Sequence, residues 1–76
     1  MTPHLCKAAR AYLDWSQADL GDRAGVTAKL VQRYENGDTS VRQGNIDRMA
    51  AAFKAAGLVI LAEDKYQGLM RFTPRG

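Results

Sequence analysis

Apolar side chains recur every three or four positions over most of the chain, as on the packed face of a helix. One stripe follows Thr2 and Pro3, a cap and a first-turn residue that favour the start of a helix. Its members are Leu5, Ala8, Ala9, Tyr12 and Leu13. A second stripe lies between about Gln43 and Gly57 and contains Ile46, Met49, Ala50 and Phe53. The pattern predicts an N-terminal helix and a longer helix in the second half, with these residues in the core.

Two short helices joined by a tight turn at Gly25–Val26 are predicted between these stripes. Ser16 and Asp19 have the spacing of a capping box, and Thr27 is the expected cap of the second short helix. At about 100° per residue, one face of that helix carries Leu30, Val31 and Tyr34. The opposite face carries Ala28, Lys29, Gln32, Arg33 and Asn36. We expect the first face to pack and the second to be exposed.

The period changes after Gly57, where two short apolar runs are typical of strands. These runs are Leu58–Leu61 and Leu69–Thr73, with the polar segment Glu63–Gly68 between them, and they predict a C-terminal β-hairpin. Both faces of the first strand are apolar, so one face needs a cover that the helices do not supply. A second subunit would provide it, and the residues expected at that dimer interface are Val59, Leu61, Met70 and Phe72. Two alternatives remain open: a helix of the same chain covers both faces, or the segment extends the helical core.

Length and charge restrict the organisation of the molecule. A chain of 76 residues forms one small domain that buries roughly 60% of its unfolded surface, so no separate ligand-sensing domain is expected. The formal net charge is +3. Because the basic residues are interleaved with Asp14, Asp19, Asp22 and Asp38, the sequence does not favour indiscriminate coating of nucleic acid.

Several classes of chemistry are disfavoured. Cys6, the only cysteine, is expected to be a small helix residue, and its lack of a disulfide partner fits a cytoplasmic location. His4 and Cys6 are spaced to different sides of a helix and supply no metal-ligand set. No nucleophile, base and orienting group stand at a catalytic spacing, so we expect no catalytic residue, no enzyme activity and no cofactor. No segment has the pattern of a signal peptide or a membrane span.

One residue and two short segments carry a resemblance to a known family: Gln17, Ala24–Val26 and Glu35–Gly37. At this spacing, residues from about 5 to 61 resemble the repressor and Cro family of lambdoid phages, the xenobiotic-response-element class of bacterial regulators. With the patterns above, the resemblance implies a mainly α fold, a four-helix repressor-like DNA-binding domain with a C-terminal β-hairpin. Residues 1–57 would form the helical part, with the motif at 16–37. Residues 58–76 would form the hairpin, a dimerisation element of the same domain.

The resemblance also implies roles for individual residues. The side chains that would face base edges in the major groove are Ala28, Lys29, Gln32 and Arg33. Those that would contact the DNA backbone are Gln17, Thr27, Asn36 and Arg42. Arg10 and Glu35 occupy the places of a partly buried structural ion pair. Without the motif, Lys29 and Arg33 would be read as a solvated helix face, and solvation of Arg42 is almost as well supported as its DNA contact.

Two residues depart from the family pattern. Gly21 stands where alanine is usual, which either permits close approach of the two short helices or loosens them. Val41 stands where proline is common, so we expect a more mobile Asp38–Arg42 loop.

The resulting hypothesis is a sequence-specific regulator of transcription that binds double-stranded DNA. As a homodimer, it would place helix 28–36 of each subunit in the major groove of an inverted repeat and act as a repressor. One alternative is the antitoxin of a toxin–antitoxin pair; another is a protein-interaction module that does not bind DNA. A protein partner, such as a toxin or polymerase, is left open.

Overall fold

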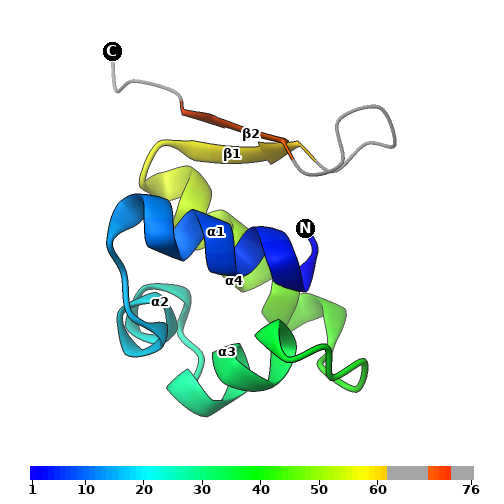
Figure 1. Ribbon diagram of the computed structural model, residues 1–76. Coiled ribbons are helices and arrows are strands. Elements are labelled where there is room, and N and C mark those ends of the chain that lie inside the picture. The colour runs from blue at the N-terminus through cyan, green and yellow to red at the C-terminus, as the bar shows by residue number, and fades with distance from the viewer. Residues whose placement is uncertain (62–68, 73–76) are drawn as a thin grey trace.

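The computed structural model describes residues 1–61 and 69–72, with side chains for residues 1–58. The described residues form four helices and two short strands. The helices are α1 (Pro3–Leu13), α2 (Gln17–Ala24), α3 (Ala28–Glu35) and α4 (Gln43–Ala55). The predicted mainly α fold with four helices is therefore confirmed. Figure 1 shows α2 and α3 on one side of α1 and α4, and the strands on the other side.

The first three helices begin at residues whose side chains satisfy free backbone N–H groups. Thr2 Oγ1 accepts from the Leu5 N–H at 3.2 Å. Ser16 and Asp19 form the complete capping box: Ser16 Oγ accepts from the Asp19 N–H, and the Asp19 carboxylate accepts from the Ser16 N–H, each at 2.9 Å. These bonds to Ser16 lower the pKa of Asp19. Thr27 Oγ1 accepts from the Leu30 N–H at 3.1 Å, so the predicted caps are confirmed.

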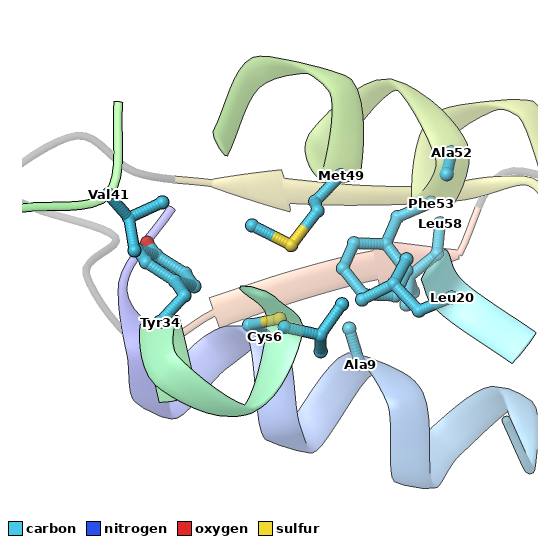
Figure 2. Packing of buried hydrophobic residues seen from close by; sticks show 10 residues of the cluster. Cys6, Ala9, Leu20, Tyr34, Val41, Met49, Ala52, Phe53 and Leu58 are labelled. Atoms are coloured by element: carbon cyan, nitrogen blue, oxygen red, sulfur yellow. The ribbon is translucent and has the colours of Figure 1, made fainter. Parts of the chain in front are cut away.

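The hydrophobic core lies where all four helices meet. Its largest fully buried side chains are Phe53, Leu20, Met49, Val31 and Cys6. Figure 2 shows this cluster, with Met49 and Phe53 of α4 lying between residues of α1, α2 and α3. Trp15, just before α2, stacks on Phe53 with ring centroids 5.7 Å apart. Burial of these large side chains is the main source of stability in so small a domain.

Helix α4 ends at Ala55, and two strands follow it. Gly57, which lies between α4 and the first strand, has a φ of +92°. Strands β1 (Leu58–Leu61) and β2 (Leu69–Phe72) pair in antiparallel fashion, with Leu58 opposite Phe72 and Ile60 opposite Met70. Strand β1 packs on α4, and β2 contacts α1. Leu58 is buried with 2% exposure, which joins β1 to the helical core. The predicted polar loop Glu63–Gly68 lies outside the described residues.

Gly21 allows close approach of α2 to the start of α3. A Cβ atom at this position would lie 2.6 Å from the Val26 carbonyl oxygen and 3.2 Å from the Ala28 nitrogen. Both neighbours are backbone atoms, which cannot move aside as a flexible side chain can. Of the two interpretations that the sequence left open, the structure supports close approach.

Val41 lies in the core at 9% exposure, although the sequence suggested a mobile loop around it. A buried β-branched side chain holds this segment against the helices by hydrophobic contact. Val41 therefore anchors the loop through packing.

Replacing Gly21 with alanine should lower the free energy of unfolding by about 1–3 kcal/mol, the cost of forcing extra volume into a packed site. This loss should occur even though alanine favours helices by about 1 kcal/mol. Urea denaturation measures the change. Gly44→Ala is the matched control, since a Cβ there meets nothing within 4 Å, and it should leave stability unchanged or raise it. Equal stabilisation by both substitutions would contradict the close approach.

Candidate nucleic-acid interface

Helix α3 presents one face to the core and the other to solvent. Val31 and Tyr34 on the inner face are 0% and 5% exposed, and Leu30 beside them packs partly against the core. The exposed residues on and next to the helix are Thr27, Ala28, Lys29, Gln32, Arg33 and Asn36. All four positions expected to face DNA bases therefore lie on a single solvent-exposed helical face.

An ion pair ties the end of α3 to α1. Arg10 donates from Nε to Glu35 Oε2 at 2.6 Å and from Nη2 to Glu35 Oε1 at 2.7 Å. The Glu35 side chain is only 1% exposed and that of Arg10 is 14% exposed. Arg10 also donates from Nη1 to the Trp15 carbonyl oxygen at 3.0 Å, which extends the link to the segment before α2. The two-point geometry holds α3 in one orientation against the other helices.

Two further donors reach the Glu35 carboxylate. Gln17 Nε2 donates to Oε1 at 3.2 Å, and the Cys6 thiol donates to Oε2 at 3.4 Å. Burial by itself would raise the pKa of Glu35, but the bonds from Arg10, Gln17 and Cys6 outweigh it and lower the pKa below its ordinary 4.5. Glu35 is therefore ionised at neutral pH, although it lies inside the protein.

The Cys6 thiol is held in its protonated form by the same surroundings. Burial, together with the nearby Glu35 charge, raises the pKa of this thiol. A protonated, fully buried thiol is a poor nucleophile and a suitable hydrogen-bond donor. Cys6 thus contributes to the core and to the support of Glu35.

Tyr34 provides a second anchor for α3. Its hydroxyl group donates to the Met1 carbonyl oxygen at 3.0 Å, while its ring packs in the core. Burial raises the pKa of Tyr34, so its hydroxyl group remains a donor at neutral pH. The N-terminal residue and the exposed helix are therefore directly connected.

The chain reverses direction immediately after α3. Gly37 has a φ of +88°, a left-handed conformation that suits glycine. The Gly37 N–H donates to the Tyr34 carbonyl oxygen and the Asp38 N–H donates to that of Arg33, both at 3.0 Å. This turn returns Asp38 to the last turn of the helix, where its carboxylate meets Arg33.

Arg33 is engaged by the loop that follows its helix. Its Nε donates to Asp38 Oδ2 at 2.8 Å, and its Nη2 donates to Ser40 Oγ at 2.9 Å. Asp38 Oδ1 accepts from the Ser40 backbone N–H at 2.8 Å and from the Ser40 hydroxyl group at 2.6 Å. These bonds from Ser40, followed by that from Arg33, lower the pKa of Asp38 to about 2.

The predicted DNA-backbone contacts other than Thr27 occupy different places around α3. Gln17 is half-buried at the start of α2 and is joined to Glu35. Asn36 is the exposed C-terminal cap of α3. Arg42 is exposed at the N-terminal cap of α4, where its side chain makes no capping hydrogen bond. The structure thus brings Arg10, Gln17 and Glu35 together and leaves Arg42 apart from them.

Sequence reasoning overlooked several partners. It did not identify Asp38 and Ser40 as neighbours of Arg33, and it did not connect Cys6 or Gln17 with Glu35. The spacing of Arg33, Gly37 and Asp38 was an available signal, because a left-handed glycine after a helix returns the next residue toward the preceding turn.

The positions proposed for dimerisation are described only by their backbone. Side chains of Val59, Leu61, Met70 and Phe72 lie outside the described residues. The register pairs Met70 with Ile60 and Phe72 with Leu58. Directly paired residues share one face of an antiparallel pair. Met70 and Phe72 therefore lie on the same face as Leu58, and Val59 and Leu61 lie on the opposite face.

Other kinds of site receive no support from the described residues. None of their helices is long and apolar enough to cross a membrane. Within the same part of the chain, no three histidine, cysteine or acidic residues are grouped so that they could hold a metal ion.

Comparison with known families agrees with this geometry. A family model described as helix-turn-helix matches residues 7–56, which is most of the 76-residue chain. The matched segment includes α2, α3 and the turn between them. No curated protein matches the chain.

Replacing Arg10 with methionine should lower the free energy of unfolding at pH 7 by about 3 kcal/mol, because Glu35 would remain buried without its main partner. The pKa of Glu35 should rise in this variant, so its carboxyl group takes up a proton at a higher pH than in the wild type. The loss of unfolding free energy should therefore be largest at neutral pH and become smaller as the pH falls through the raised pKa of Glu35. Urea denaturation over a pH series measures both effects.

Arg48→Met is the matched control, since Arg48 is exposed on α4 and its replacement should change stability by less than about 0.5 kcal/mol. A loss that is the same in both variants, or that does not depend on pH, would argue against the buried pair.

Proposed function

The chain belongs to the helix-turn-helix family of DNA-binding transcription regulators, and from this premise we propose that it recognises a specific duplex sequence through α3. The observation that carries the proposal is the exposed face of α3, whose opposite face is fixed to the core. An α-helix fits the major groove of B-DNA, where each base pair presents a distinct pattern of donors and acceptors. A rigidly supported helix with exposed polar side chains suits this form of recognition.

The four exposed positions supply complementary contacts. Lys29 and Arg33 donate to the O6 and N7 acceptors of guanine, and Gln32 suits the donor and acceptor of adenine. Ala28 is small and apolar, which suits a thymine methyl group. This combination favours base recognition over general attraction to phosphate.

Contacts with the DNA backbone would set the register of α3 in the groove. Gln17 uses one amide hydrogen on Glu35, and its second amide hydrogen is available for a phosphate oxygen. The first turn of α3 contains no acidic residue, so the positive end of the helix dipole also favours an anion there. Thr27, Asn36 and Arg42 are exposed near α3 and complete the proposed set.

The proposed active form is a homodimer that binds an inverted repeat. With a formal charge of only +3, one chain makes few phosphate contacts, and two chains double that number. Two copies related by a twofold axis would read half-sites about 34 Å apart. In β1, Val59 and Leu61 alternate with the buried Leu58, so their face of the proposed hairpin is the one left for a second subunit.

Repression is the proposed mode of regulation. A small dimer seated on promoter DNA excludes polymerase by occupying the site, and this mechanism requires no further contact surface.

Selection of bound duplexes from a random pool should yield an inverted repeat for the wild-type chain. Arg33→Ala should then lose preference at one base position in each half-site, at a cost of about 1–3 kcal/mol against the best duplex. Gln17→Ala should lower the affinity for all duplexes by a similar factor, because a phosphate contact does not depend on the identity of the base. An Arg33→Ala variant that loses affinity equally for every sequence would exclude its role in base recognition. If the wild-type chain binds no duplex at physiological salt, the result would favour a module that contacts only protein.

Leu61→Glu should shift the chain from dimer toward monomer, because a charge placed in an apolar interface loses its hydration without gaining a partner. Sedimentation velocity over a concentration series measures the shift. Thr39→Glu adds the same charge at an exposed loop position and should leave the proportion of dimer unchanged. If the two variants sediment alike, the dimer surface lies elsewhere.

A further inference from the structure

The guanidinium group of Arg33 is held on one edge and open on another. Asp38 accepts from Nε and Ser40 accepts from Nη2, as described above. Among the residues that the structure describes, no protein group accepts from Nη1. Despite its two bonds to the loop, the Arg33 side chain is 46% exposed. The loop therefore restrains this side chain without covering it.

Asp38 is itself fixed from several directions. Its backbone N–H bonds to the Arg33 carbonyl oxygen, and its Oδ1 accepts both donors of Ser40. With a pKa of about 2, its carboxyl group is ionised throughout the neutral range. A partner that is anchored in this way limits the rotamers of Arg33 more than a free surface carboxylate would.

We propose that Asp38 and Ser40 are positioning residues that orient Arg33 for base recognition and so determine how strictly one base pair is selected. This proposal rests on the proposed function of α3. Arginine recognises guanine through two parallel donors, and two donors must be aimed together for the contact to be specific. With Nε and one Nη2 hydrogen engaged by the loop, the terminal edge formed by Nη1 and the second Nη2 hydrogen remains for the base.

The charge of Asp38 supports this interpretation. A carboxylate beside the DNA-facing helix repels phosphate groups, so on charge alone it weakens binding to every duplex. An exposed ion pair also adds little to folding stability. Orientation of Arg33 accounts for a carboxylate at this position, since it exchanges some general affinity for selectivity.

The test compares Asp38→Asn and Ser40→Ala with the wild type on the selected duplex and on duplexes altered at the base pair assigned to Arg33. Restricting one long side chain is equivalent to about a 2- to 12-fold change in an equilibrium constant. We expect Asp38→Asn to reduce discrimination at that base pair by a factor in this range. Ser40→Ala should act in the same direction without changing net charge. Thermal unfolding of each variant verifies that the fold is retained.

Asp22→Asn is the matched control, because it removes the same charge from an exposed position on α2. It should raise affinity for all duplexes through charge and leave discrimination intact. If Asp38→Asn has only this uniform effect, the positioning role is overturned.

A second measurement separates this inference from the proposed function. In the DNA-free protein, the Arg33 Nε–H should give a slowly exchanging NMR signal that is lost in Asp38→Asn. An unchanged signal would overturn the restraint of Arg33. If the wild type selects no sequence, base recognition by α3 fails, while loss of this signal would still support the restraint.

Discussion

The orientation of the exposed helix depends on one buried carboxylate. An ionised carboxyl group inside a protein is costly unless its oxygens receive hydrogen bonds and a compensating charge. Glu35 receives both, from Arg10 and Cys6 of α1 and from Gln17 of α2. Because these donors come from separate helices, the carboxylate is satisfied only when the helices are assembled correctly. The same bonds that neutralise the cost of burial therefore specify the arrangement of α1, α2 and α3.

The two sides of α3 divide structural support from the proposed DNA recognition. The inner side contributes Val31 and Tyr34 to the core, and Glu35 ends the helix at the ion pair. None of the positions proposed to face DNA bases is needed for that packing, so under this proposal their identities are free to follow the DNA sequence. Gln17 is the point where the two sides meet, since it contacts Glu35 and lies where a phosphate contact is proposed. A disturbance of the ion pair would consequently reach the proposed DNA backbone contact directly.

Local chemistry explains which features could be predicted from the sequence. Caps at Ser16 and Thr27 depend on neighbours three residues away, and the faces of α3 depend on helical periodicity, so both are visible in the sequence. The Arg10–Glu35 contact was expected only through family resemblance, because 25 residues separate the partners. Partners of Arg33 were missed because a left-handed Gly37 predicts the reversal of the chain but not which side chains of the following loop meet Arg33. The burial of Val41 likewise depends on the path of a loop, which periodicity does not define.

The environment of Trp15 gives the molecule an intrinsic optical probe. It is the only tryptophan in the sequence, its ring stacks on Phe53 of α4, and the Arg23 guanidinium of α2 lies 4.5 Å from the ring centroid. Its fluorescence therefore comes from a single junction, where the helix-turn-helix unit meets the helix that leads to the strands. Separation of these two parts would remove the Phe53 ring from the indole and expose the indole to water, while Arg23 of α2 would stay beside it. Emission from one native side chain thus reports the integrity of this junction without any added label.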